Sequence, residues 1–168
     1  MMEVHKTQFV QMIHQNRGII NSLCQLYYRR VEDREDARQD IILQLWRSYP
    51  SFRQESAVST WVYRVALNTL LAKIRKEKRC LPSESLESTD EANWMAIPQA
   101  DDDLQLLHQI IQSLRPQDKA VVILYLEGYK NREIAEMLAM SPTNVSTKLN
   151  RIKTTLKKQY INLSYESR

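Results

Sequence analysis

Hydrophobic residues recur every three or four positions along most of the chain, the spacing that places them on one face of a helix. This pattern predicts helices over residues 4–30, 33–49, 57–78, 104–113, 116–128, 131–140 and 142–160. Folds built from hairpins depend on glycine-rich turns, and the 168 residues include only 2 glycines and 5 prolines. We therefore expect an all-α protein.

Turn-forming residues mark where several of these helices begin and end. Gly18 lies inside the first predicted helix, and we expect it to kink or divide that helix. Pro50 should end the second helix, because proline does not continue the hydrogen-bond pattern. Gly128 is expected to cap the end of the helix over 116–128. Ser141 before Pro142 is typical of a helix start.

Residues 80–103 separate the two groups of helices and lack helical periodicity. They carry 7 acidic residues and no Lys or Arg. Residues 1–79 carry 14 basic and 8 acidic side chains, and residues 104–168 carry 10 basic and 5 acidic ones. The net charge of +4 is thus the balance of two small basic domains, 1–79 and 104–168, and an acidic flexible linker, 80–103. A plain solvated tether fits the linker composition equally well.

The last two predicted helices and the turn between them have the pattern of a helix-turn-helix. In the final helix, the face opposite Val145, Leu149 and Ile152 contains no Asp or Glu. Solvated helices normally mix charges, so this face favours DNA, whose bases a recognition helix reads with its N-terminal part. The candidate DNA-binding residues are Thr143, Asn144, Ser146, Thr147, Lys148, Asn150 and Arg151. The alternative is a basic packing unit that binds no DNA.

The first domain carries two candidate surfaces. The helix over 33–49 has a polar face of Asp36, Gln39, Asp40 and Leu43. A leucine among acids and amides favours a protein-docking surface, and the alternative is a single exposed leucine.

The helix over 57–78 is apolar almost all round, with one stripe that differs. Its members are Trp61, Arg64, Asn68, Leu71 and Arg75. An indole can stack on an unpaired base, and guanidinium groups bind phosphates, so the stripe favours nucleic acid. The basic end KIRKEKR adds phosphate-binding charge. Read alone, however, these features favour the alternative, in which Trp61 belongs to the core and KIRKEKR is a solvated helix end.

Candidate chemistry beyond binding is absent from the sequence. The 3 histidines have no metal-ligand spacing with cysteines or acids, so we expect no metal site. Two glycines do not supply a phosphate-binding loop, and no catalytic constellation emerges, so we expect neither a cofactor nor a small-molecule substrate, and no enzyme. Cys24 should be a packed thiol, and Cys80 has no assigned role. With no transmembrane segment and no secretory signal, we expect a cytoplasmic protein.

Both domains together resemble one known family over nearly the whole chain. EDREDARQDIILQLWRSYPSF and ESAVSTWVYRVALNTLLAKIRKEKR are similar to region 2 of the sigma-70 family, specifically its small extracytoplasmic function (ECF) group. LRPQDKAVVILYLEGYKNREIAEMLAMSPTNVSTKLNRIKTTLKK is similar to region 4. The resemblance implies an alternative sigma factor that binds bacterial core RNA polymerase and directs promoter-specific initiation.

The resemblance also implies roles for particular residues. Asp36, Gln39, Asp40 and Leu43 would dock on core polymerase. Those that would capture and hold the unpaired −10 strand are Phe52, Arg53, Gln54, Glu55, Ser56, Trp61, Arg64, Asn68 and Arg75. The final helix would read the −35 element. An anti-sigma factor, which is often membrane-bound in this family, is an implied partner, and the acidic linker would imitate nucleic acid inside polymerase.

Three positions depart from the family pattern. Ala72 stands where the family often has aspartate. Ala139 stands where the helix-turn-helix turn usually has glycine, and we expect its φ to stay negative. Near Lys130 the family has serine or threonine, and we expect Asn131 to cap the following helix instead.

Two other functions compete with a sigma factor. A helix-turn-helix repressor or activator would bind DNA as a dimer without being a polymerase subunit. An anti-sigma or adaptor protein would use its helices only to grip other proteins, which the acid-free helix face disfavours.

Overall fold

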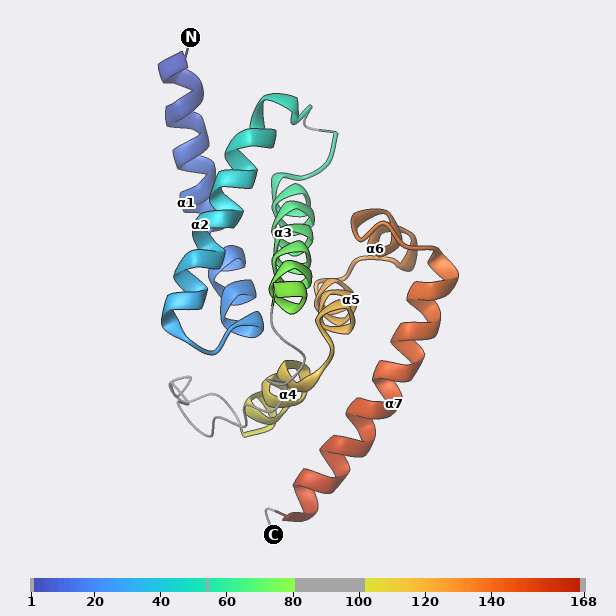
Figure 1. The fold of residues 1–168 in the computed structure, drawn as a ribbon. Coiled ribbons are helices and arrows are strands. Elements are labelled where there is room, and N and C mark those ends of the chain that lie inside the picture. The colour runs from blue at the N-terminus through green and yellow to red at the C-terminus, as the bar shows by residue number, and fades with distance from the viewer. Residues whose placement is uncertain (1, 54, 81–101, 167–168) are drawn as a thin grey trace. The chain divides into compact units, whose positions relative to one another are not determined.

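The computed structural model describes residues 2–53, 55–80 and 102–166, and within these ranges every regular element is helical. The all-α prediction is therefore confirmed. The chain divides into two compact units, Met1–Ser85 and Leu86–Arg168. No helix of the described residues is long and apolar enough to cross a membrane. Figure 1 shows the helices of both units in chain order.

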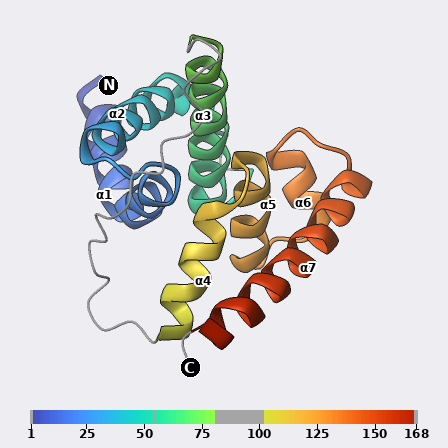
Figure 2. The same ribbon diagram turned by 60° about the horizontal axis from the view of Figure 1, so that its bottom comes forward.

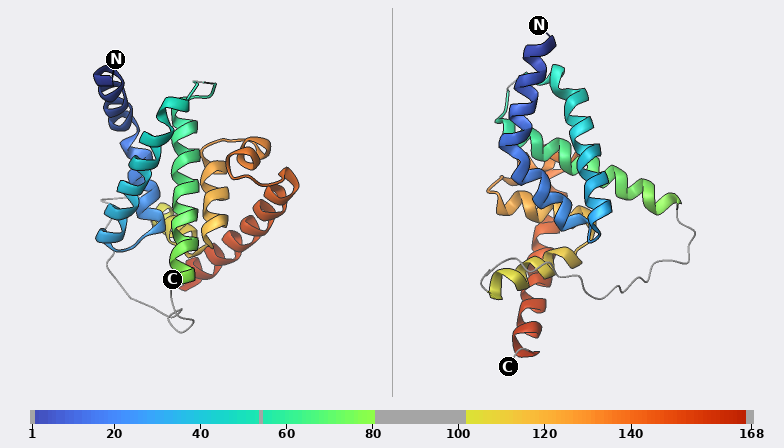
Figure 3. Two further views of the ribbon diagram at one scale, coloured as in Figure 1. Left: turned by 45° about the horizontal axis from the view of Figure 1, so that its top comes forward. Right: turned by 90° about the vertical axis from the view of Figure 1, so that its left-hand side faces the viewer.

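The first unit packs three long helices side by side. They are α1 (Met2–Tyr27), α2 (Val31–Ser48) and α3 (Val58–Cys80), and all three contact one another (Figure 3). The core is formed by the apolar faces of the three helices. Hydrophobic residues at helical spacing lie on one face of a helix, so they are buried together along its length. Its fully buried side chains include Ile20, Ile41, Leu45, Val62 and Leu67.

The structure corrects one detail of the first unit and confirms another. Gly18 does not divide α1, which is one continuous helix. Helix α2 ends at Ser48, just before Pro50 as predicted, and Tyr49–Ser51 form a single 3-10 turn, η1, after it. The turn between α1 and α2 is closed by Arg34, whose Nε donates to the carbonyl oxygen of Tyr28 at 3.1 Å. Cys24 is packed as expected, and burial raises the pKa of its thiol to about 11.

The second unit has one long helix against which three short ones pack. They are α4 (Asp102–Ser113), α5 (Pro116–Leu126), α6 (Asn131–Met137) and α7 (Pro142–Glu166). Figure 2 shows α4, α5 and α6 along α7. A helix as short as α6 is not stable alone in water. Burial of Val145, Leu149 and Ile152 of α7 therefore supports the short helices.

The predicted linker and the described helices overlap at both ends. Cys80 is the last residue of α3, and α4 begins at Asp102, so the ends of the predicted span 80–103 are helical. The rest of the linker lies outside the described residues, as does Gln54.

Two helices of the second unit end in the same hydrogen-bond motif with different residues at the critical position. After α5, Tyr129 N–H donates to the Leu124 carbonyl and Gly128 N–H to the Tyr125 carbonyl, both at 3.1 Å. After α6, Met140 N–H donates to the Ala135 carbonyl at 2.8 Å, and Ala139 takes the place of the glycine. Both are Schellman motifs, which require a left-handed residue.

The backbone at these two positions is left-handed, with φ of 88° at Gly128 and 51° at Ala139. The expectation that φ of Ala139 stays negative is therefore wrong. The turn forms because its hydrogen bonds offset the steric cost that a Cβ atom adds in this conformation, about 1–2 kcal/mol. Nothing lies within 4 Å of a Cβ built on Gly128, so conformation alone separates the two sites.

The start of α6 also differs from expectation. Asn131 is the first helical residue and Lys130 precedes the helix, so Asn131 is not the cap. Instead, Glu133 accepts a hydrogen bond of 2.7 Å from the backbone N–H of Lys130. The start of α7 agrees with the sequence, because Ser141 Oγ accepts from the Asn144 N–H at 3.2 Å.

The paired turns generate a reciprocal prediction. Ala139→Gly should raise the free energy of unfolding of the second unit by about 1 kcal/mol, because glycine adopts positive φ without a Cβ clash. Gly128→Ala should lower it by a similar amount for the same reason. Denaturant unfolding of both variants measures the two changes. A destabilised Ala139→Gly protein would contradict the left-handed assignment.

Candidate nucleic-acid and protein interfaces

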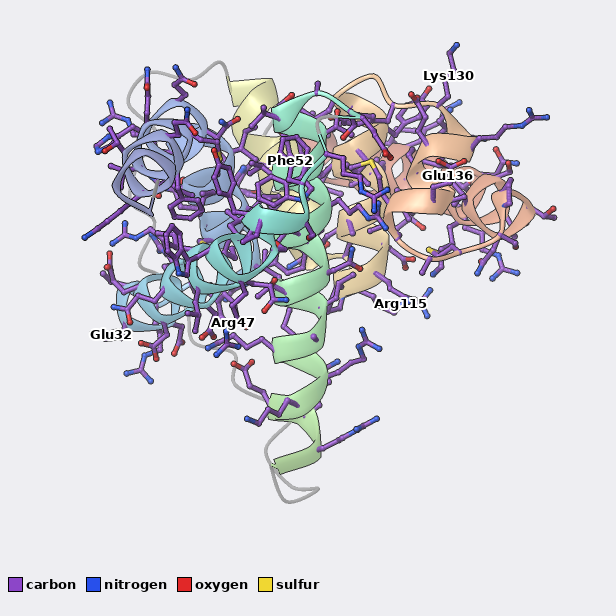
Figure 4. All side chains as sticks on the ribbon, turned by 90° about the horizontal axis from the view of Figure 1, so that it is seen from above. Glu32, Arg47, Phe52, Arg115, Lys130 and Glu136 are labelled. Atoms are coloured by element: carbon purple, nitrogen blue, oxygen red, sulfur yellow. The ribbon has the colours of Figure 1, made fainter. Side chains whose placement is uncertain are left out.

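An aromatic cluster joins the end of α2 to the start of α3. Phe52 and Trp61 are stacked, with ring centroids 4.7 Å apart and an interplanar angle of 26°. Tyr49 lies 6.3 Å from Trp61 and 5.3 Å from Phe9 between centroids, and Phe9 meets Trp46 edge-on at 4.9 Å. These contacts hold the turn between α2 and α3 against the helices, and Figure 4 shows Phe52 there.

Of the residues that sequence analysis assigned to the −10 strand, Phe52 and Trp61 belong to this cluster, and the described loop residues lie between them in the chain. Phe52 and Trp61 are half-buried, whereas Arg53, Glu55 and Ser56 are exposed. Phe52 covers one face of the indole, so a base that stacks on Trp61 would use the remaining face. Trp61 is therefore both a packing residue and an accessible one.

Along α3, the polar residues of the predicted stripe lie on the surface, whereas its leucine does not. Arg64, Asn68 and Arg75 are exposed, but Leu71 is buried and belongs to the core. Two of the polar side chains are aligned along the helix, because Asn68 donates to the Arg64 carbonyl at 2.8 Å and Arg75 to the Leu71 carbonyl at 3.2 Å. The helix then ends in exposed basic residues, Lys76, Lys78 and Arg79.

The predicted docking face of α2 is exposed and carries an ion pair. Asp36, Gln39 and Leu43 are exposed, with Leu43 at 47%. Asp40 Oδ2 is 2.6 Å from Lys73 Nζ of α3, which fixes this carboxylate. Partial burial lowers the Lys73 pKa, but the hydrogen bond and charge of Asp40 outweigh it, so the pKa is raised overall.

Trp46 extends this surface, which sequence analysis missed. Its spacing places it beside Leu45 on the apolar side of α2, yet 44% of it is exposed, one helical turn from Leu43. Its ring meets Phe9 of α1 edge-on. Periodicity alone gives no signal for this exposure, because exposure depends on packing between helices.

The outer face of α7 presents a row of polar side chains without acids. The exposed residues there include Thr143, Asn144, Thr147, Asn150 and Arg151. The Thr147 hydroxyl donates to the Thr143 carbonyl at 2.9 Å, which orients it along the helix. These groups match the donors and acceptors that base edges offer in a major groove.

Two of the predicted DNA-binding residues instead contact neighbouring helices. Ser146 Oγ accepts from Asn131 Nδ2 at 2.9 Å and donates to the Pro142 carbonyl at 3.0 Å. Lys148 Nζ lies 2.7 Å from Asp118 Oδ1 of α5, and only 18% of the lysine side chain is exposed. The structure therefore separates these two from the exposed row.

Asp118 and Asn131 are the residues that sequence analysis missed here. Asp118 is 6% exposed and lies in the first turn of α5. Its second carboxylate oxygen is 3.0 Å from Nε of Arg115, whose side chain reaches outward in Figure 4. Carboxylates are common near helix starts, so the sequence does not indicate that Asp118 has a partner on α7. That contact is apparent only in the folded unit.

No group of three or more potential metal ligands occurs among the residues that the structure describes. The histidines offer no such site, and His108 pairs with Gln112 at 3.0 Å within α4.

Two family models match the chain in the order that the two units have. A model described as sigma-70 region 2 matches residues 12–80, and one described as sigma-70 region 4 matches residues 104–156. The chain belongs to the sigma-70 family of RNA polymerase sigma factors. Within that family it is a member of the ECF group, as its curated relatives are.

The relatives are distant but span most of the chain. SigM, an ECF RNA polymerase sigma factor of Mycobacterium tuberculosis, is 29% identical over 88% of this chain and 74% of its own length. SigW of Bacillus subtilis, also an ECF RNA polymerase sigma factor, is 27% identical over 90% of this chain and 88% of its own length.

Solved structures share the fold. The sigma factor RpoE of Bartonella quintana, in complex with the anti-sigma factor NepR, matches with a TM-score of 0.74 at 18% identity. The match covers 91% of this chain and 96% of RpoE. CnrH, in complex with the cytosolic domain of CnrY, matches with a TM-score of 0.62 at 17% identity.

The stacked pair generates a prediction about stability. Phe52→Leu and Trp61→Leu should each destabilise the first unit, and together they should show a coupling free energy of about 0.5–1.5 kcal/mol. Denaturant unfolding of the wild type, both single variants and the double variant measures it. Val31→Ala, at the far end of α2, should be additive with Trp61→Leu. Additivity in the stacked pair as well would show that the rings do not interact.

Proposed function

We propose that this protein is an alternative sigma factor that binds bacterial core RNA polymerase, recognises a bipartite promoter and opens its −10 region. The observation that carries the proposal is the combination of two different binding surfaces on one chain. The first unit has an aromatic and basic surface suited to an unpaired strand, and the second has an acid-free helix suited to duplex DNA. A repressor that binds only duplex DNA needs no surface of the first kind.

In the second unit, α7 would enter the major groove at the −35 element. Its N-terminal half carries Thr143, Asn144, Thr147, Asn150 and Arg151, all exposed. Arginine can pair with guanine and asparagine with adenine, each through two hydrogen bonds. Lysines farther along the helix, such as Lys157 and Lys158, would neutralise phosphates.

In the first unit, the −10 strand would lie along the loop after η1 and the outer face of α3. Arg64 and Arg75 would bind phosphates, and Asn68 would contact a base or the backbone. The free face of Trp61 would stack on an unpaired base. Arg53, Gln54, Glu55 and Ser56 would form the pocket wall for a flipped base; Gln54 lies outside the described residues.

The α2 face of Asp36, Gln39, Asp40 and Leu43 would dock on core polymerase, with Trp46 as an additional apolar contact. A second partner is an anti-sigma factor, because the structurally similar sigma factor RpoE was solved in complex with the anti-sigma factor NepR. The protein would act in the cytoplasm, where polymerase is, and would have no catalytic activity of its own. Its acidic linker would imitate nucleic acid inside polymerase.

Transcription with purified components tests the proposal. Run-off reactions should combine the full chain, core RNA polymerase and fragments of the genome that encodes both. Initiation at a small set of start sites, dependent on the added chain, is expected. Binding of duplex fragments with no initiation and no association with core would favour a repressor or activator. Failure to bind either DNA or core would contradict both functions.

Arg151→Ala should weaken initiation at a dependent promoter by about 1–3 kcal/mol and relax selectivity at one upstream base pair, because it removes a base contact. Quantitative run-off on promoters with each upstream base pair substituted measures this. Lys158→Ala is the control, since loss of a phosphate contact should weaken all sequences equally. An equal loss on every sequence for Arg151→Ala would make Arg151 a phosphate contact.

Leu43→Asp should reduce the affinity for core polymerase by about 1–2 kcal/mol, since an apolar side chain at a docking face loses its desolvated contact. Stability should change little, because the side chain is exposed in the free protein. Fluorescence anisotropy with labelled protein measures core binding. Val31→Asp, which alters an equally exposed residue at the start of α2, should bind normally. Unchanged core binding by Leu43→Asp would exclude Leu43 from the interface.

A further inference from the structure

The buried stripe of α7 is bordered on both edges by a polar contact. At about 100° per residue, Lys148 lies about 60° to one side of Val145 and Ser146 about 100° to the other. Lys148 is bound by Asp118 of α5 at 2.7 Å, and Ser146 by Asn131 of α6 at 2.9 Å. The two contacts therefore oppose rotation of α7 in opposite directions.

Asp118 is held more firmly than an ordinary surface carboxylate. It is 6% exposed, and its two oxygens are divided between Lys148 and Arg115. Its backbone N–H donates to the Arg115 carbonyl at 2.9 Å, within the first turn of α5. A buried carboxylate is costly without partners and is favoured at a helix start. Asp118 therefore gives Lys148 a fixed point on α5.

Apolar packing alone restricts the rotation of α7 about its axis less than these polar contacts do. The contacts of Val145, Leu149 and Ile152 bury area without a preferred direction, whereas a charge-assisted hydrogen bond has a narrow range of distances. Without the contact between Lys148 and Asp118, α7 would be able to turn slightly about its axis while its apolar stripe stays buried.

Rotation at Lys148 would move two exposed side chains of the reading face. Asn144 precedes Lys148 by four residues and Arg151 follows it by three, so the three side chains are neighbours along one edge of α7. An anchor at the middle of this edge fixes where both neighbours point. The edge faces α5 at Lys148 and solvent at Asn144 and Arg151.

We propose that Asp118 is a positioning residue of the DNA-reading helix. By holding Lys148 it sets the rotation of α7 and so decides which base edges Asn144 and Arg151 reach. Lys148 is then an anchor and not a DNA contact. This inference rests on the proposed −35 recognition by α7.

The experiment measures base preference separately from overall activity. The full chain and core polymerase transcribe a library in which the upstream element of a dependent promoter is randomised, and the enriched sequences are counted. The proteins are wild type, Asp118→Asn, the double variant Asp118→Leu with Lys148→Met, and Lys148→Arg. The double variant removes the ion pair and leaves no buried charge unpaired, because Arg115, which also loses Asp118, is exposed to solvent. Thermal unfolding of each protein accompanies the selection.

Asp118→Asn and the double variant should both lose or shift preference at one or two base pairs, by about tenfold, the size of one lost base contact. Lys148→Arg retains the ion pair and should select the wild-type sequences. Wild-type preference in a folded double variant would overturn the proposal, because the ion pair would then serve stability alone. A uniform loss on all sequences for the double variant, with Asp118→Asn unaffected, would also overturn it and make Lys148 a phosphate contact.

Failure of the proposed function gives a different result. If wild type enriches no upstream sequence in the presence of core polymerase, α7 does not read a promoter element and the function itself is wrong. If wild type enriches a sequence and the variants enrich the same one equally, only the role of Asp118 is wrong.

Discussion

Burial of the narrow apolar stripe of α7 is the constraint on which the second unit depends. Among the side chains of α7 that the structure describes, Val145, Leu149 and Ile152 are the buried ones, and the three short helices pack against α7. Each buried side chain of this size contributes about 1.5–3 kcal/mol. Because the stripe is narrow, most of the circumference of α7 stays in solvent. The same burial that stabilises the unit therefore also exposes its reading face.

The first unit is also stabilised by burial of apolar helix faces, but the turn that carries its candidate binding residues is held in a different way. All three of its helices are long and bury apolar side chains in a shared core, and a short turn joins α2 to α3. That turn is instead held by aromatic rings, with Phe52 on Trp61 and Tyr49 against Phe9. Because Phe52, Trp61 and Tyr49 are only partly buried, they hold the backbone of the turn and leave part of their own surface accessible to a partner. A rigid scaffold thus presents a loop with several exposed polar groups.

Much of this was predictable because helical periodicity is strong and glycine is scarce. The seven predicted helices all exist, and their ends differ from the prediction by a few residues. The errors fall where local signals compete with tertiary contacts. Ala139 adopts a left-handed backbone because two hydrogen bonds of the Schellman motif require it. Asn131 is the first residue of α6 and not its cap, and its side chain donates to Ser146 of α7, fifteen residues away.

The amino-acid order fixed the helices, the order of the two sigma-70 regions and the exposed acid-free face of α7, since each depends on residues that are near in sequence. Only the folded units decided which polar residues on that face are free to bind. Ser146 and Lys148 share the composition and spacing of their neighbours, yet each is taken up by a residue of another helix. Leu71, expected on the polar stripe of α3, is likewise buried in the core, and Trp46 of α2 is exposed. Partner choice across helices depends on packing distances, which a one-dimensional pattern does not contain.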